Sequence, residues 1–283
     1  MRIAIVGFGA AAQAFVPAIQ ANHDFELVAI VENNLTVQDA AKQLGVPVFS
    51  QFADLKKIQN LDGVYIATPT PCHAAQSIEA FASGWHVLVE KPMACNAAEA
   101  LRMVTAANQY GKSLTVGHSH SFDAPIQAMK KIIDSGELGA VQMVNTWCYT
   151  DWVYRPRRPE ELDPALGGGV TFRQGAHQID ILRALCGEKV DTVKAKVFNL
   201  DPQRQTMGAH AIYLDFANGP AATAGIRPGD VIVKVAGQPV GNVAELLTQV
   251  ASLKPGVPAE VNVWRRQGEV NLRLTPAEDR KST

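Results

Sequence analysis

The stretch RIAIVGFGAAA, residues 2–12, decides the fold. Residues 2–6 are mostly apolar and predict a short strand that is buried on both faces, as in a parallel sheet. The glycines at positions 7 and 9 predict a tight turn, and the alanine-rich residues after them predict a helix over 10–21. A strand, a glycine turn and a helix in this order are typical of a doubly wound α/β domain.

The same alternation continues to about residue 120. Further short apolar runs predict strands over 26–31, 63–67, 86–90 and 113–117, and the alanine-rich stretches 73–83 and 97–110 predict helices between them. Asn96 and Glu99 have capping-box spacing before the second of these helices. We therefore expect an α/β Rossmann-type domain with a doubly wound parallel sheet.

The glycine turn has the residues of a dinucleotide site. Gly7 permits the tight turn, Gly9 lets the backbone approach a pyrophosphate, and Ala12 allows close packing of the helix on the sheet. Glu32 ends the second strand, where a carboxylate would accept the ribose hydroxyls. No arginine follows it to hold a 2′-phosphate, which favours NAD over NADP. The alternative is a structural glycine turn beside a surface glutamate.

After residue 120 the pattern changes to an α+β domain. A helix is expected over 124–135, and longer alternating runs predict antiparallel strands over 140–150, 190–200 and 209–216. Between them, we interpret the glycines 167–169 as a flexible loop before a helix over 174–185.

Composition and charge exclude several classes of function. The chain has 283 residues with 26 basic and 27 acidic side chains, a balance that indicates neither nucleic-acid binding nor an acidic tail. No apolar run reaches the length of a membrane span. The four cysteines have no metal-binding spacing, so we expect free thiols in the cytoplasm. His118 and His120 could ligate zinc, but no third ligand is near in sequence and we expect no metal.

Two motifs follow neighbouring strands. Glu90-Lys91-Pro92 comes after the strand at 86–89, and Thr68-Pro69-x-x-x-His73 comes after the preceding one. Because the carboxyl ends of parallel strands share one edge, both motifs face the crevice where ligands bind. A histidine, His177, lies at the start of the helix expected after the glycines 167–169. Taken alone, Lys91 is best interpreted as a solvated lysine and His177 as a capped histidine at a helix start.

The ordered set of motifs resembles the Gfo/Idh/MocA family of NAD(P)-dependent oxidoreductases. Four segments match in order over residues 1 to about 218: the E-K-P tripeptide, the T-P-x-x-x-H segment, Phe122 to Gly139 (ending in IDSGELG), and the glycine run followed by G-x-H-x-x-D at 175–180. The resemblance implies that Lys91 and His177 are catalytic and flank the reacting carbon. The expected cofactor is NAD, and its expected contacts are Gly7, Phe8, Gly9, Ala10, Ala11, Ala12, Glu32, Thr68, Pro69, His73, Glu90 and Lys91.

One position departs from the family pattern. Four residues before the histidine, family members usually have an aspartate, whereas this chain has Arg173. Arginines bind carboxylates with two parallel hydrogen bonds, which favours a carboxylated substrate over a neutral sugar or inositol. The phthalate 4,5-cis-dihydrodiol dehydrogenase branch looks closest, and it implies oxidation of a ring cis-diol to a catechol. The expected substrate-binding residues are Arg155, Arg157, Arg158, Arg173 and Asp180.

The arginine-rich stretch has a second interpretation as a solvated charge run paired with Glu160, Glu161 and Asp163. A sugar or inositol dehydrogenase therefore remains an alternative function. Family members continue past the position of Phe216 with strands that complete the open sheet and often form a dimer. This continuation is absent here, so a homo-oligomer is an expectation that rests on the resemblance alone.

From residue 219 onward the chain resembles part of the PDZ domain of HtrA-type proteases. GPAATAGIRPGDVI at 219–232 and VAGQPV at 235–240 carry this likeness. We expect an NAD domain at 1–120, a truncated substrate domain at 121–218, a partial PDZ-like domain at 219–278 and a tail at 279–283. No nest-forming loop precedes His210, so we do not expect peptide binding. A peptide-binding module joined near Gly219 to an inactive nucleotide-binding domain is the competing hypothesis.

Overall fold

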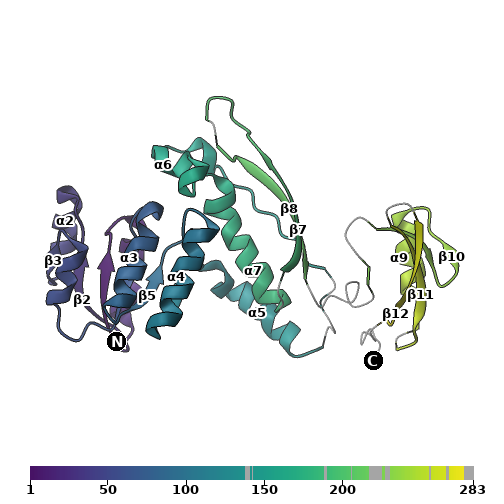
Figure 1. The fold of residues 1–283 in the computed structure, drawn as a ribbon, viewed down its shortest axis with the longest axis horizontal. Helices are drawn as coiled ribbons and strands as arrows, with labels where there is room; N and C mark the ends of the chain where they lie inside the picture. The colour runs from purple at the N-terminus through teal and green to yellow at the C-terminus, as the bar shows by residue number, and fades with distance from the viewer. Residues whose placement is uncertain are drawn as a thin grey trace. The chain divides into compact units, whose positions relative to one another are not determined.

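Six parallel strands form one sheet in the first part of the chain (Figure 1). Their order is β3-β2-β1-β4-β5-β6, so the chain reverses direction across the sheet between the neighbours β1 and β4. The strands are β1 (Arg2–Val6), β2 (Glu26–Val31), β3 (Val48–Phe49), β4 (Gly63–Ile66), β5 (His86–Val89) and β6 (Leu114–Val116). The doubly wound parallel sheet is confirmed, and the ligand crevice of such a sheet lies where its order reverses.

The computed structural model describes residues 1–283 except 138–140, 142, 188–189, 205, 217–224, 227–229, 255, 266–267 and 277–283. The described chain divides into two compact units. The first unit comprises residues 1–118, 150–176 and 198–209, and the second comprises residues 119–149, 177–197 and 210–283. The expected join near Gly219 lies outside the described residues.

Helices cover both faces of the six-stranded sheet. They are α1 (Ala10–Ala21), α2 (Leu35–Lys42), α3 (Thr70–Ala82) and α4 (Ala97–Tyr110). On β1, Ala4 and Val6 pack in a core with α3 and α4, whereas Ile5 packs in a second core with α1 and α2. Alternate side chains of one short strand are thus buried on opposite faces, which is why its sequence is apolar throughout.

Helix caps fix where some of these helices begin. The side chain of Asn96 accepts a hydrogen bond from Glu99 N at 2.9 Å, which confirms the expected cap of α4. Asn34 caps α2 in the same way, with its side chain accepting from Thr36 N at 3.0 Å. The sequence analysis missed both α2 and the two-residue strand β3.

The first unit also contains two segments from later in the chain. Residues 150–176 form short turns: η3 (Trp152–Tyr154), α6 (Pro159–Leu162), η4 (Pro164–Leu166) and the π-helical turn η5 (Thr171–Gly175). Trp152, Val153 and Val170 form a small core of their own with Leu162. Residues 198–209 join this unit as well.

The second unit contains helices, a two-stranded sheet and a small four-stranded sheet. Its elements are η2 (His120–Phe122), α5 (Ala124–Asp134), α7 (Ala176–Cys186), β7 (Val190–Phe198), β8 (Ala209–Phe216), β9 (Val231–Val235), β10 (Gln238–Pro239), α9 (Val243–Ala251), β11 (Ala259–Arg265) and β12 (Gly268–Leu274). Three end residues of these elements, Ala176, Phe198 and Ala209, belong to the first unit. The expected strands at 190–200 and 209–216 are confirmed as β7 and β8. The antiparallel sheet β10-β9-β11-β12 has its own core around Val235, Val261 and Val263.

The strand expected over 140–150 is wrong for the residues that the structure describes there. Residues 141 and 143–150 form no strand, and Met143, Trp147 and Tyr149 are exposed. The alternating pattern is present in the sequence, but a strand also needs a hydrogen-bonded neighbour.

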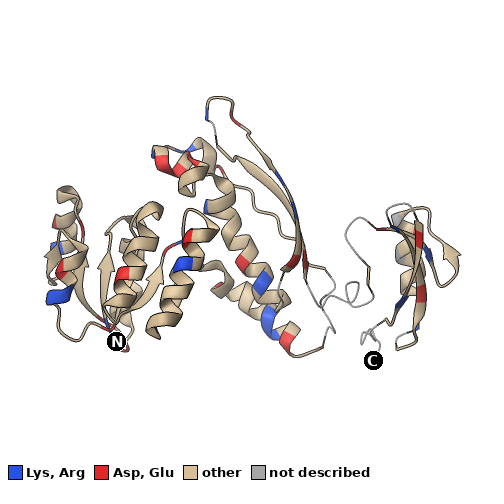
Figure 2. Cartoon of the chain, in the orientation of Figure 1, with Lys and Arg blue, Asp and Glu red and all other residues tan. Residues whose placement is uncertain are grey.

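Residues of both charge signs are distributed over the elements (Figure 2), in keeping with the net charge of −1. None of the helices in the described part of the chain is long and apolar enough to span a bilayer.

Candidate active site

Two glycines build the turn after β1, and the structure requires them for different reasons. Gly7 has φ +85°, and a Cβ at this position would lie 2.8 Å from Thr68 N. Any other residue would be strained there. Gly9 has φ −74°, and a Cβ would meet nothing within 4 Å. The packing of the protein therefore does not require glycine at position 9, and the space beside it is open to a ligand.

The start of α1 and Glu32 suit a dinucleotide. Gly9 is the N-cap of α1 and forms no side-chain cap, so the positive end of the helix dipole is available to phosphate. The Glu32 carboxylate accepts hydrogen bonds from Phe8 N at 2.7 Å and from Asn34 N at 2.8 Å. Each carboxylate oxygen keeps a further lone pair for a ribose hydroxyl. These residues fit NAD.

Alanines follow the glycine turn in α1. Ala12 is fully buried, so the helix packs closely on the sheet, while Ala10 and Ala11 are exposed at the start of the helix.

His73 connects the ends of β4 and β5. Its ring is buried, with Nδ1 3.0 Å from Pro92 O and Nε2 2.8 Å from Thr68 O. Burial lowers the pKa of His73 below its usual value. The expected cofactor residue His73 thus contacts two backbone carbonyls, and it fixes the Thr68–Pro69 segment beside the Lys91–Pro92 segment.

Glu90 is also held by groups of the protein. Its carboxylate accepts hydrogen bonds from the Tyr65 hydroxyl at 2.7 Å and from Lys91 N at 3.1 Å. Burial, together with this hydrogen bond, raises the pKa of Tyr65, so the phenol stays protonated. Glu90 therefore orients the backbone from which Lys91 extends.

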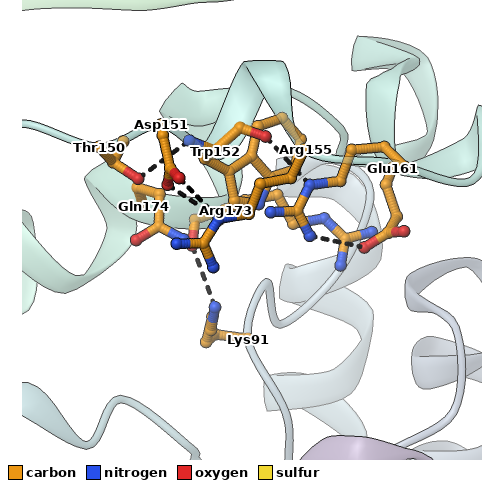
Figure 3. A pocket seen from close by; sticks show the side chains of 9 residues that line it. Lys91, Thr150, Asp151, Trp152, Arg155, Glu161, Arg173 and Gln174 are labelled. Carbon is orange, nitrogen blue, oxygen red and sulfur yellow. Dashed lines mark hydrogen bonds and ion pairs between the residues drawn. The ribbon is translucent and has the colours of Figure 1, made fainter.

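A cavity of about 390 Å³ lies next to Lys91 in the first unit (Figure 3). Four cationic and two acidic side chains contribute to its wall. It is lined by Lys91, Thr150, Asp151, Trp152, Arg155, Arg157, Glu161, Arg173 and Gln174. The structure thus brings the lysine of the E-K-P motif together with three of the four arginines expected to bind substrate.

Lys91 and Arg173 meet directly. The Lys91 ammonium donates a hydrogen bond of 3.1 Å to the backbone carbonyl of Arg173 (Figure 3). Burial lowers the pKa of Lys91, and the charges of Arg173 and Arg157 lower it further, although Glu90 opposes this effect. A lysine in this environment can polarise an oxygen and exchange a proton more readily than a solvated one.

Arg157 is held against Trp152. Its guanidinium lies 4.5 Å from the centre of the indole ring, and its Nε donates to Trp152 O at 3.1 Å. Glu161 lies 4.0 Å from the same guanidinium. Burial would raise the pKa of Glu161, but hydrogen bonds from Arg158 outweigh it and the pKa is lowered. Trp152 was not among the expected site residues, although its place beside several arginines in the sequence was the available signal.

Arg173 forms no close ion pair in the described part of the chain, although the charge of Glu161 acts on it. Its Nε is buried without a hydrogen-bond partner among the described residues, and burial lowers its pKa. Of the lining cations, Arg155 pairs with Asp151 at 2.9 Å and Arg157 lies near Glu161. In the part of the chain that the structure describes, neither Lys91 nor Arg173 has a carboxylate within 4 Å. The cavity therefore suits an anion.

Arg158 lies outside the cavity lining. Its side chain pairs with Glu160 at 3.2 Å and Glu161 at 3.4 Å, as the charge-run interpretation predicted for this residue. Arg155 lines the cavity, although its side chain is largely exposed.

The glycine run 167–169 is not a flexible loop, and that interpretation was wrong. All three glycines are buried, and a Cβ at Gly168 would lie 2.5 Å from Glu161 O. Gly168 N donates to Asp163 O and Gly169 N donates to Glu161 O, each at 2.8 Å. The glycines permit close packing that fixes the turn before Arg173.

His177 and Asp180 are on α7 in the second unit. His177 is buried, and its ring centre lies 4.1 Å from that of His120, whose Nδ1 is 3.6 Å from Asp123. The pairing of His177 with Lys91 stays a prediction. Among the described residues, no group of three or more His, Cys, Asp or Glu side chains could hold a metal ion.

Three family models match the chain. An oxidoreductase family with an NAD-binding Rossmann fold (Gfo/Idh/MocA) matches residues 1–118, and the C-terminal domain of the same family matches residues 126–226. A PDZ domain matches residues 216–275.

Curated relatives and solved structures agree with these matches. A 1-carboxy-3-chloro-3,4-dihydroxycyclohexa-1,5-diene dehydrogenase of Comamonas testosteroni is 42% identical over 78% of this chain and 56% of its own length. An inositol 2-dehydrogenase of Streptomyces avermitilis is 33% identical over 53% of this chain and 41% of its own. The chain thus spans about half the length of these relatives. The WlbA dehydrogenase from Bordetella pertussis, crystallised with NADH and UDP-GlcNAcA, superposes with a TM-score of 0.70 and 26% identity over 96% of this chain and 73% of that one.

Proposed function

Since the chain belongs to the Gfo/Idh/MocA oxidoreductase family over most of its length, we propose that it oxidises a hydroxyl of a small carboxylated ring substrate with NAD. The favoured substrate is a cis-dihydrodiol of the phthalate type. The relative from Comamonas testosteroni has a name that describes a ring with one carboxylate and two hydroxyls. A homo-oligomer is part of this proposal. The four cysteines are free thiols, and we place the reaction in the cytoplasm.

The first unit supplies the binding site for the cofactor. The uncapped start of α1 and Gly9 would hold the pyrophosphate, and Glu32 would hold the ribose. NAD, when bound, accepts a hydride from the carbon that carries the hydroxyl.

In this proposal, Lys91 and His177 have different roles in the oxidation of the hydroxyl. The Lys91 ammonium donates a hydrogen bond to the substrate oxygen, orients it and stabilises the carbonyl that forms. His177 takes the hydroxyl proton as the C–H bond breaks and the C=O bond forms. The resulting ring ketone loses a proton from the neighbouring carbon and gains one on oxygen, which gives the catechol.

Arg173 is the observation that carries the choice of substrate. Arg173 and Lys91 line the same cavity. Among the described residues, the buried Nε of Arg173 has no hydrogen-bond partner, and neither cation has a carboxylate within 4 Å. A substrate carboxylate would balance both charges and form charge-assisted hydrogen bonds. A neutral polyol would leave these charges uncompensated.

Turnover assays with NAD test the proposal. We expect NADH formation with ring cis-diols that carry carboxylates, little with myo-inositol, and none with the variant Lys91→Met. Turnover of myo-inositol but not of the carboxylated diols would overturn the substrate choice and favour a polyol dehydrogenase.

The PDZ-like part is the basis of the second candidate function. Its match and its four-stranded sheet with α9 support a PDZ-like part of the chain. The second candidate is a peptide-binding module joined to an inactive nucleotide-binding domain. Titration with apolar C-terminal peptides separates the two functions, because saturable peptide binding without turnover of any diol would support the second.

A further inference from the structure

We propose that Arg204 is a positioning residue that holds residues 150–158 in place, an inference that rests on the proposed function. This segment carries Arg155, Arg157 and Arg158 and is called the arginine loop below. Arg204 belongs to the segment 200–208, called the strap below, in which residue 205 lies outside the described residues. The strap follows the cavity-lining residues 150–174 in sequence at a distance of more than 20 residues, but it is part of the same unit. No motif in the sequence singles out Arg204.

The guanidinium of Arg204 contacts the backbone of the arginine loop. Its Nη1 donates hydrogen bonds to the carbonyls of Val153 and of Arg155, the latter at 2.8 Å. Its Nε lies 3.7 Å from Asp201, which orients the side chain from within the strap. One arginine therefore fixes the two carbonyls that flank Tyr154.

These carbonyls belong to the stretch of chain that contributes Trp152, Arg155 and Arg157 to the cavity wall. Trp152 precedes them and supports Arg157, while Arg155 itself lines the cavity. The 3₁₀ turn Trp152–Tyr154 is only three residues long, so it has few hydrogen bonds of its own. The contacts of Arg204 with the loop backbone therefore determine where Arg155 and Arg157 are held.

The rest of the strap contacts the segment 162–170, which leads to Arg173 and is called the second loop below. Thr206 is buried, and its hydroxyl donates to Leu162 O at 2.7 Å. Val170 N donates to Met207 O at 2.7 Å. Gly169 has φ +88°, and a Cβ there would lie 3.0 Å from Met207 Cβ, so glycine permits this close approach. One strap thus fixes both loops, and Arg204 is its contact with the arginine loop.

The test compares Arg204→Ala and Arg204→Lys with the control Arg102→Ala, which removes an exposed arginine of α4 that does not line the cavity. For Arg204→Ala we expect KM for a carboxylated cis-diol to rise about 10-fold. The hydrogen bonds from the charged guanidinium to Val153 O and Arg155 O are lost, so the arginine loop is no longer held for binding. We expect kcat to change less than about 3-fold. Arg204→Lys should restore most of the affinity, because an ammonium can also donate to both carbonyls. NAD affinity should stay unchanged in all three variants.

Hydrogen–deuterium exchange gives a readout that does not depend on activity. In Arg204→Ala, amides of residues 150–158 should exchange faster, whereas those of α3 and α4 should not change. Unchanged exchange and an unchanged KM would overturn the inference. Faster exchange in a protein whose wild type turns over no carboxylated diol would instead refute the proposed function alone. If Arg204→Ala does not fold, Arg204→Gln, which keeps one side-chain donor, decides the question by the same two measurements.

Discussion

The ammonium of Lys91 donates a hydrogen bond of 3.1 Å to the backbone carbonyl of Arg173, 82 residues away in the sequence. This contact joins the turn after β5 to the π-helical turn that carries Arg173. π-helical turns are frequent at functional sites. It also brings two half-buried cations to one cavity, where no carboxylate of the described chain lies within 4 Å of either. Such an arrangement costs stability and becomes favourable when an anion binds.

Lys91→Met should abolish turnover and raise stability together. Removing the ammonium removes the group that orients the hydroxyl, and we expect turnover to fall at least about 100-fold. Removing an unpaired, half-buried charge should stabilise the fold by on the order of 1 kcal/mol. Thermal unfolding and NAD calorimetry check this prediction, and NAD binding should persist. A variant that is both inactive and less stable would contradict it.

The stability gain of Lys91→Met should shrink as pH rises. Burial lowers the pKa of Lys91 in the folded state, while the unfolded chain keeps the usual value of about 10.4. Between these two values the unfolded state binds more protons, so the stability of the wild type rises with pH. The variant lacks this contribution. Urea unfolding of both proteins between about pH 7 and about pH 10 measures the difference, and a constant gap would refute the assignment.

Arg173→Gln should weaken the carboxylated substrate selectively. Charge-assisted hydrogen bonds contribute about 1.5–3 kcal/mol, so kcat/KM for a carboxylated cis-diol should fall about 10- to 100-fold. Arg155→Gln is the matched control, because this largely exposed arginine pairs with Asp151 and should matter only a few-fold. Steady-state kinetics of both variants measure the two losses in kcat/KM. Equal losses would show that the cavity attracts anions through its general charge rather than through Arg173.

The parallel sheet could be predicted because its signals are local. An apolar run, a glycine turn and a helical pattern each occupy a few adjacent residues, and β1 to α1 is such a unit. The strand β3 has only two residues and exists because Val48 pairs with Ile30 of β2. No local pattern of two residues can indicate a strand, so this element was missed.

The site was predicted as separate parts. The motifs indicated Lys91 and Arg173, but their contact depends on how the chain brings distant turns together. The glycines 167–169 were interpreted as flexible because glycine is common in loops, whereas here the lack of a Cβ permits tight packing. Arg204 was missed because its role depends on carbonyls 49 and 51 residues away.

Glu32→Gln should reduce the preference for NAD over NADP. The wild-type carboxylate can accept ribose hydroxyls and repels a 2′-phosphate. The amide removes that repulsion, and we expect the ratio of the two affinities to fall about 10-fold. Asp39→Asn is the control, since it removes one negative charge from the exposed face of α2. Calorimetry with each cofactor measures the ratio, and tighter binding of NADP by the wild type would refute the choice of NAD.

Gly7→Ala and Gly9→Ala should separate folding from cofactor binding. At position 7 a Cβ would lie 2.8 Å from Thr68 N at φ +85°, so the alanine should cost about 1–3 kcal/mol of stability. At position 9 a Cβ meets no protein atom within 4 Å, so the alanine should leave thermal unfolding unchanged. It would project into the space that we assign to the pyrophosphate, and we expect NAD affinity to fall at least about 10-fold. Unfolding curves and NAD calorimetry of the two variants provide the comparison. If Gly9→Ala bound NAD as tightly as the wild type, the dinucleotide could not lie against this turn, and the proposed transfer of hydride from the substrate carbon to NAD beside Lys91 would lose its basis.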